Sequence, residues 1–132
     1  MNFQEIRKYY ELPVVEACNL AGVTYRPENT LAPDGDAITK YCLARLQFGE
    51  MAESAITCGP VSHKRAVFTV EFYGPKGVGP AEAQNFMSDV MCRIGGLNGV
   101  NSVNGPDFTA LDETPYYFAR VSFGLQIPTE LN

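Results

Sequence analysis

Apolar residues recur at helical spacing in two segments of the chain. Spacings of three and four predict a helix over residues 2–21 that stops at Gly22. Pro13 interrupts this helix, and because proline lacks the amide hydrogen that a helix interior needs, we expect a kink or two short helices. A second apolar stripe predicts a helix over Pro80–Ile94, closed by two glycines. The first stripe holds Phe3, Ile6, Tyr10, Val14, Ala17 and Ala21; the second holds Ala83, Phe86, Met87, Val90, Met91 and Ile94.

Alternation of apolar and other residues predicts three strands, over Ile38–Phe48, Ala66–Tyr73 and Tyr116–Ile127. Two shorter β-like pieces, Val100–Val103 and Phe108–Leu111, flank the turn formers Asn-Gly-Pro. The expected core-facing residues are Cys42, Ala44, Leu46 and Phe48, then Phe68, Val70 and Phe72, then Tyr117, Ala119, Val121, Phe123, Leu125 and Ile127.

Two stretches lack a period. Residues 23–36 are rich in turn formers and predict an extended loop, and Gly49–Arg65 predicts a long excursion between two paired strands. The sequence has no internal repeat and no change in composition that would mark a domain boundary, so we expect one domain over residues 1–132. The order of elements predicts an α/β fold of the α+β sandwich kind. In it the N-terminal and central helices pack on one face of a small, mainly antiparallel sheet.

Composition and charge argue against several classes of function. The net charge of −5 and the pI of about 4.8 argue against a nucleic-acid binder, which needs a basic face. No stretch approaches the ~20 apolar residues of a membrane helix. Cys18, Cys42 and Cys92 sit among apolar residues, which indicates buried, reduced thiols in a protein that folds inside a cell. With one histidine and no C-x-x-C pair, we expect no metal site.

The glycine-rich stretch GPKGVGP, from Gly74 to Pro80, is the first candidate for chemistry. It matches neither the G-x-x-x-x-G-K-[ST] nor the G-x-G-x-x-G phosphate-binding pattern, so we interpret it as a connector between strand and helix. His63 lies five residues from Cys58, but nothing marks the two as an activated pair. Acidic residues occur in four pairs: Glu11 and Glu16, Asp34 and Asp36, Glu50 and Glu53, and Asp112 and Glu113. The second and fourth pairs lie in polar loops, which indicates solvated side chains rather than an acid–base pair. We therefore predict no catalytic residues and no cofactor.

Aromatic residues lie on the sheet face away from the predicted core: Tyr41, Tyr73, Tyr116 and Phe118. Such residues favour protein contacts, although they could instead cover loops or a further helix.

The order of these features resembles the tail terminator proteins of long-tailed bacteriophages. The resemblance covers nearly the whole chain. It begins with the N-terminal helix and the loop and strand YRPENTLAPDGDAITKYCLARL. It continues through AVFTVEFYGPKGVGPAEAQNFMSDVMCRI, a strand, a glycine-rich connector and a helix. It ends with the last strand YYFARVSFGLQ.

This resemblance implies a viral structural protein without enzymatic activity or cofactor. It implies a six-fold ring of the chain on the finished tail tube, which stops tube polymerisation and meets the head–neck connector. The expected partners are further copies of the chain, the tube protein and the connector, with no membrane and no sequence-specific nucleic acid. The expected location is the head-proximal end of the tail in the virion, after folding in the host cytoplasm.

The excursion is the candidate contact with the tube or the next copy, because its mixed charges could complement a repeated interface. The candidate interface residues are Glu50, Glu53, His63, Lys64 and Arg65. Three other functions fit the sequence. They are another neck protein or a tail tube subunit, a small α/β enzyme or ligand-binding module, and a monomeric adaptor with one partner.

Overall fold

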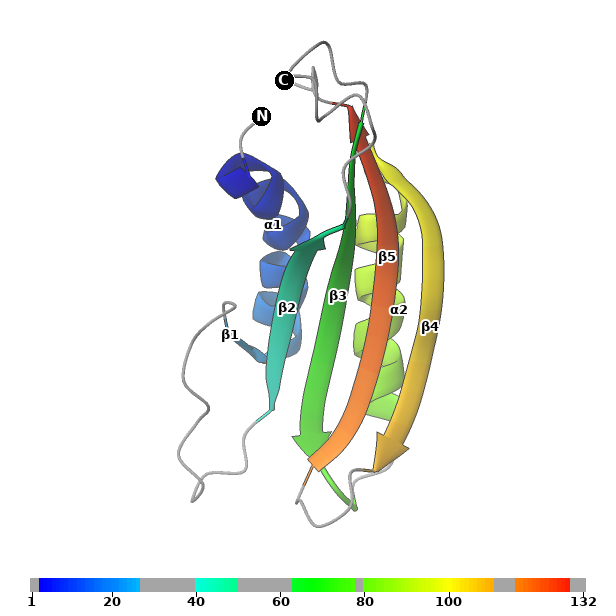
Figure 1. The fold of residues 1–132 in the computed structure, drawn as a ribbon. Helices are drawn as coiled ribbons and strands as arrows, with labels where there is room; N and C mark the ends of the chain where they lie inside the picture. The colour runs from blue at the N-terminus through cyan, green and yellow to red at the C-terminus, as the bar shows by residue number, and fades with distance from the viewer. Residues whose placement is uncertain (1–2, 27–39, 50–62, 78–79, 111–115, 129–132) are drawn as a thin grey trace.

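The computed structural model describes residues 3–26, 40–49, 63–77, 80–110 and 116–128 (Figure 1). This part of the chain forms two helices and one five-stranded sheet, an α+β fold, which confirms the predicted fold class. The elements are α1 (Phe3–Ala21), β1 (Thr24–Arg26), β2 (Tyr41–Phe48), β3 (His63–Pro75), α2 (Ala81–Gly95), β4 (Val100–Ala110) and β5 (Tyr116–Pro128).

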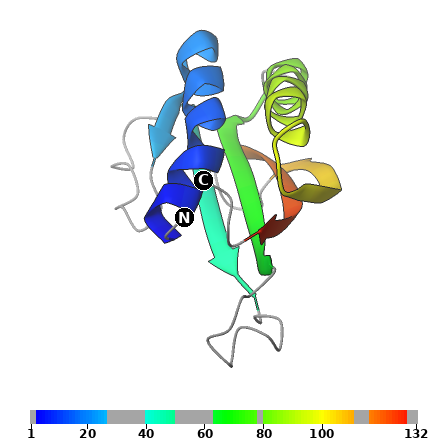
Figure 2. The same ribbon diagram turned by 90° about the horizontal axis from the view of Figure 1, so that it is seen from above.

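The strands lie in the order β1-β2-β3-β5-β4. Only the short β1–β2 pair is parallel, and the other three pairs are antiparallel. Both helices pack on the same side of the sheet, as Figure 2 shows, which confirms the predicted one-sided layering. Neither helix in the described part of the chain is both long and apolar enough to cross a membrane.

The core lies between the helices and the sheet. The stripe of α2 is confirmed, with Met91 partly buried and the other five residues buried. The rings of Phe86 on α2 and Phe72 on β3 pack with centroids 5.1 Å apart. Burying this stripe removes apolar area from water, which stabilises the fold by about 25 cal/mol per Å². The buried sheet residues are Cys42, Ala44, Leu46, Ala66, Phe68, Val70, Phe72, Ala119, Val121, Phe123 and Leu125.

α1 continues through Pro13. The sequence predicts a kink or two short helices there, and because the helix is one element from Phe3 to Ala21, the second alternative is wrong. Tyr10 and Val14, on either side of Pro13, are both fully buried, and the Tyr10 hydroxyl donates a hydrogen bond to the Asn98 carbonyl. These contacts hold both halves of the helix against the core and override the local preference of proline.

The end of α1 follows the prediction. Gly22 has φ +70°, a left-handed conformation that glycine adopts at no steric cost. The Val23 amide donates to the Cys18 carbonyl at 2.9 Å, the pattern of a Schellman cap. Cys18 and Cys42 are buried as predicted, and burial raises the pKa of the Cys42 thiol. Cys92 is exposed on α2, so the prediction that it is buried is wrong.

The last part of the sheet also differs. β4 is one strand, whereas the sequence predicts two short pieces around a turn. Its register against β5 shifts between Val100 and Ser102 and again between Asn104 and Asp107. Two β-bulges therefore absorb the extra residues, the second around Gly105, and the strand continues.

The sequence pattern did not predict β1, and it predicted a shorter β3 than the structure shows. β1 lies in the predicted loop 23–36, of which residues 27–36 fall outside the described residues. β3 begins at His63 and includes Gly74 and Pro75. The last residues of the predicted excursion and the first residues of the predicted glycine-rich stretch therefore belong to this strand. Pairing with β5 explains the extension, since the ladder runs from His63 opposite Pro128 to Pro75 opposite Tyr116.

Candidate functional site: the open face of the sheet

The face of the sheet opposite α1 and α2, which we call the open face, is the candidate surface. No helix in the described part of the chain covers it (Figure 2). Strand alternation sends every second side chain to this face and the others into the core. Its residues include Arg26 on β1, Tyr41, Leu43, Arg45 and Gln47 on β2, Arg65, Val67, Thr69, Glu71 and Tyr73 on β3, Asp107 on β4, and Tyr116, Phe118, Arg120, Ser122, Gly124 and Gln126 on β5.

One end of the open face carries an aromatic cluster of Tyr41, Tyr73, Tyr116 and Phe118, the residues predicted to lie opposite the core. Tyr41 and Tyr73 are register partners, and their rings stack with centroids 4.6 Å apart and planes 9° apart. The Tyr116 ring meets both edge-on, at 5.6 and 6.1 Å. The Phe118 ring lies 5.1 Å from Tyr73, and the Arg26 guanidinium lies 5.7 Å from the Tyr41 centroid. The cluster is therefore a preformed aromatic surface, half-buried rather than covered.

Two tyrosines of this cluster, Tyr41 and Tyr73, stay protonated at neutral pH because their pKa values are raised. Burial raises the pKa of Tyr73 to about 12, and the neighbouring Glu71 carboxylate adds to that shift. Burial also raises the pKa of Tyr41. Each phenol therefore keeps its hydrogen and can donate it to an acceptor on a partner.

An ion pair occupies the middle of the open face. Arg45 Nη2 lies 2.9 Å from Glu71 Oε1 and joins β2 to β3. Glu71 is only 7 % exposed and is the one buried charged residue in the described part of the chain. A buried carboxylate requires a cationic or hydrogen-bonding partner, so the pair fits a structural role. Beside it, the hydroxyls of Thr69 and Ser122 lie 3.3 Å apart across β3 and β5.

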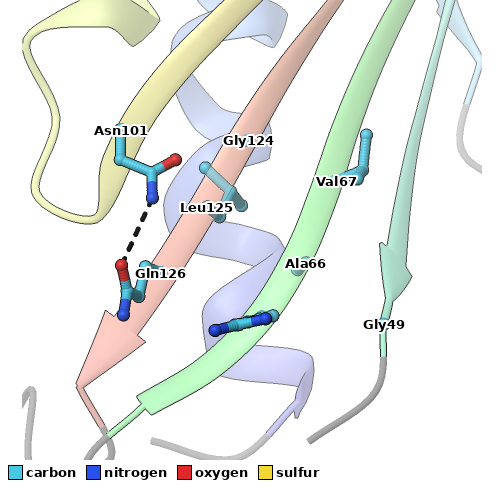
Figure 3. Close-up of a pocket in the computed structure, with 8 residues that line it drawn as sticks. Gly49, Ala66, Val67, Asn101, Gly124, Leu125 and Gln126 are labelled. Atoms are coloured by element: carbon cyan, nitrogen blue, oxygen red, sulfur yellow. Dashed lines mark hydrogen bonds between the residues drawn. The ribbon is translucent and has the colours of Figure 1, made fainter. Parts of the chain in front are cut away.

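The opposite end of the open face contains a shallow hollow of about 370 Å³ (Figure 3). Glycine at position 124 keeps its floor low, because a Cβ there would lie 2.2 Å from Ser102 Oγ. Asn101 Nδ2 donates to Gln126 Oε1 at 3.3 Å along one side. Val67, 43 % exposed, adds an apolar wall. The lining residues are Gly49, Arg65, Ala66, Val67, Asn101, Gly124, Leu125 and Gln126.

The candidate interface residues from the sequence separate into two groups. Glu50 and Glu53 lie outside the described residues. The backbones of His63, Lys64 and Arg65 form the first three positions of β3, and the Arg65 side chain is exposed and lines the hollow. Arg65 is thus the one predicted interface residue whose side chain the structure places on a candidate surface.

The sequence pattern did not indicate the other residues of the hollow. Gly124 was the available signal, since a glycine inside a strand pattern marks a bulge or a close approach of another chain segment. Asn101 gave no such signal, because only the first bulge of β4 brings it beside Gln126.

The other sequence candidates do not assemble into an active site among the described residues. Glu11 pairs with Arg7 at 3.4 Å, and Glu16 pairs with Arg93 at 3.2 Å. Cys58 and the acidic pairs at 34 and 36 and at 112 and 113 lie outside the described residues. Within the described ranges, no three histidine, cysteine or acidic side chains gather as metal ligands would.

Comparison with known proteins supports the fold. No protein-family model matches the chain, and no curated protein does. A solved structure whose name states no function matches with a TM-score of 0.70 and 17 % sequence identity. The match covers 100 % of this chain and 99 % of the other. The chain therefore shares a known α+β fold over its whole length.

Proposed function

We propose that the chain is a structural subunit of the tail terminator kind. Six copies form a ring on the head-proximal end of a phage tail tube, stop its growth and join the tail to the neck connector. The protein acts by assembly, without catalysis or a cofactor, and belongs to the virion after folding in the host cytoplasm. The proposed six-fold ring follows from the resemblance of the sequence layout to that family.

The observation that carries the proposal is the aromatic cluster on the open face. Aromatic side chains outside a core are enriched at protein interfaces, where they bury large areas at a low entropic cost. The rings of Tyr41 and Tyr73 are already stacked, so a partner that covers them loses little freedom in ordering them.

The composition of the hollow favours assembly over catalysis. Its polar side chains are those of Arg65, Asn101 and Gln126. General acid–base catalysis most often uses a histidine, carboxylate, lysine, tyrosine or cysteine side chain, and the eight lining residues include none of these. Arginine and amide groups are instead suited to hydrogen bonding with another protein.

The first test is the solution mass over a wide concentration range, with electron micrographs of the same samples. The proposal predicts closed rings of six 14.5-kDa copies, about 87 kDa in all, that do not grow into tubes. Open-ended tubes would instead identify a tube subunit. A monomer that also failed to cap isolated tails would overturn the proposal.

A second test addresses the excursion after β2. We propose that the excursion Gly49–Arg65 contacts the tube or the next copy, with Glu50, Glu53, His63, Lys64 and Arg65 as its charges. Deleting residues 52–61 should abolish tail capping or ring formation. Intact rings that still bound tails would show that this segment is not part of the interface.

A further inference from the structure

The outer surface of α1 exposes two large apolar residues. Leu12 is 59 % exposed and Leu20 is 77 % exposed. Glu16 lies between them, so the three residues follow one another at intervals of four along one side of the helix. At 1.5 Å per residue, this outer stripe of α1 is about 12 Å long. Exposed leucines arranged around one carboxylate are a suitable ridge for docking on another protein surface.

The opposite side of the molecule offers a concave surface of matching character. The hollow on the open face combines the exposed apolar side chain of Val67 with the exposed guanidinium of Arg65. Its volume of about 370 Å³ is near the lower bound of ligand pockets, which is ample for one protruding side chain. Gly49 and Gly124 contribute no side chains, so a helix ridge can approach the strands closely.

The two layers of the molecule carry opposite charges. The helices α1 and α2 together hold five acidic and three basic residues. The described strands present four arginines and two acids on the open face; these are Arg26, Arg45, Arg65 and Arg120, with Glu71 and Asp107. A helix layer placed on an open face is therefore electrostatically complementary, whereas two open faces placed together would set arginines against arginines.

We propose that the outer stripe of α1 in one copy docks in the hollow of the next copy. Leu20 enters the hollow beside Val67. Glu16, whose side chain is 55 % exposed within its ion pair with Arg93, approaches Arg65 of the next copy. This inference deepens the proposed function, on which it rests, by naming the contact between neighbouring subunits. The stripe and the hollow lie on opposite layers, so each docked copy keeps one unused patch. Such a front-to-back contact closes into a ring or continues as a filament, and it cannot stop at a symmetric dimer.

Two single variants and their mixture test the contact. Leu20→Asp damages the stripe and Val67→Asp damages the hollow, and both positions are exposed enough for the chain to fold. Each variant alone should associate at least about 30-fold more weakly in sedimentation velocity, the size of a hot-spot loss. Mixed together, they should form a 1:1 dimer, because one intact stripe then meets one intact hollow. Val103→Asp is the matched control, since Val103 is also 43 % exposed but lies outside both patches.

Several results would overturn the inference. Unchanged self-association of either variant, absence of the mixed dimer, or an equal loss in the control would each do so. A wild-type chain that stays monomeric up to about 1 mM would also contradict it, as this contact would then have no useful affinity. That result leaves the proposed function open, because capping of isolated tails is measured separately. Conversely, front-to-back association without tail capping would uphold this contact and overturn the proposed function.

Discussion

The aromatic cluster makes a quantitative prediction about coupling between Tyr41 and Tyr73. Their rings stack at 4.6 Å, and such a pair is worth about 0.5–1.5 kcal/mol beyond the area that it buries. Because both residues are half-exposed, we expect the lower half of that range. In a double-mutant cycle, Tyr41→Ala and Tyr73→Ala should show a coupling of about 0.5–1 kcal/mol.

The single variants should differ in a defined order. Tyr73 contacts three rings and Tyr41 contacts two rings and one guanidinium. We expect a loss of about 2 kcal/mol for Tyr73→Ala and about 1.5 kcal/mol for Tyr41→Ala. Both values are decreases in the free energy of unfolding. They would be measured by urea titration with circular dichroism at a concentration where the protein is monomeric.

The control for this cycle pairs Tyr41→Ala with Leu12→Ala, which lies on the opposite layer. Those two losses should add within about 0.3–0.5 kcal/mol. If the coupling between Tyr41 and Tyr73 were no larger than that, the rings would not be held together in the free protein. The open face would then lack a preformed aromatic surface, and the support that it gives to the proposed function would fall.

Other predictions concern the helix–sheet contact and the hollow. Tyr10→Phe removes the hydrogen bond to the Asn98 carbonyl and should lower the free energy of unfolding by about 1 kcal/mol; no change in urea titration would contradict that role. Burial raises the pKa of Tyr10 to about 12, so the folded state holds this proton more tightly than the unfolded state. Its contribution is complete below about pH 10 and is lost between about pH 10 and 12, and the alkaline loss should shrink in Tyr10→Phe. Gly124→Ala places a Cβ 2.2 Å from Ser102 Oγ and should destabilise the protein by about 1–3 kcal/mol, and adding Ser102→Ala should restore much of the loss.

Periodic segments of the sequence predicted the fold class and most of the core. The stripe of α2 and the alternation in β5 depend on local spacing, which a single sequence displays directly. Non-local pairing decided the rest. β1 has only three residues and no period, and it exists because it pairs with β2, with the Thr24 amide donating to the Lys40 carbonyl at 3.2 Å. Pro13 remains inside α1 because tertiary contacts outweigh its local preference.

The candidate site was also predictable only where it depends on local spacing. Alternation placed the four aromatic residues on the face opposite the core, but only the register of β2, β3 and β5 shows that their rings touch. The hollow depends on a bulge in β4, which has no sequence period, and on Gly124. A glycine in a strand pattern marks a close approach but does not show which segment approaches. The exposure of Leu12 and Leu20 likewise depends on which side of α1 packs against the sheet.

The most direct test of the proposed function is capping of the tail tube. Tubes growing from a phage tail tube protein would be mixed with this chain and imaged by electron microscopy. The proposal predicts a ring of density at one end of each tube and an end to growth there. Bare tube ends with continued growth, or incorporation of the chain along the tube, would contradict it.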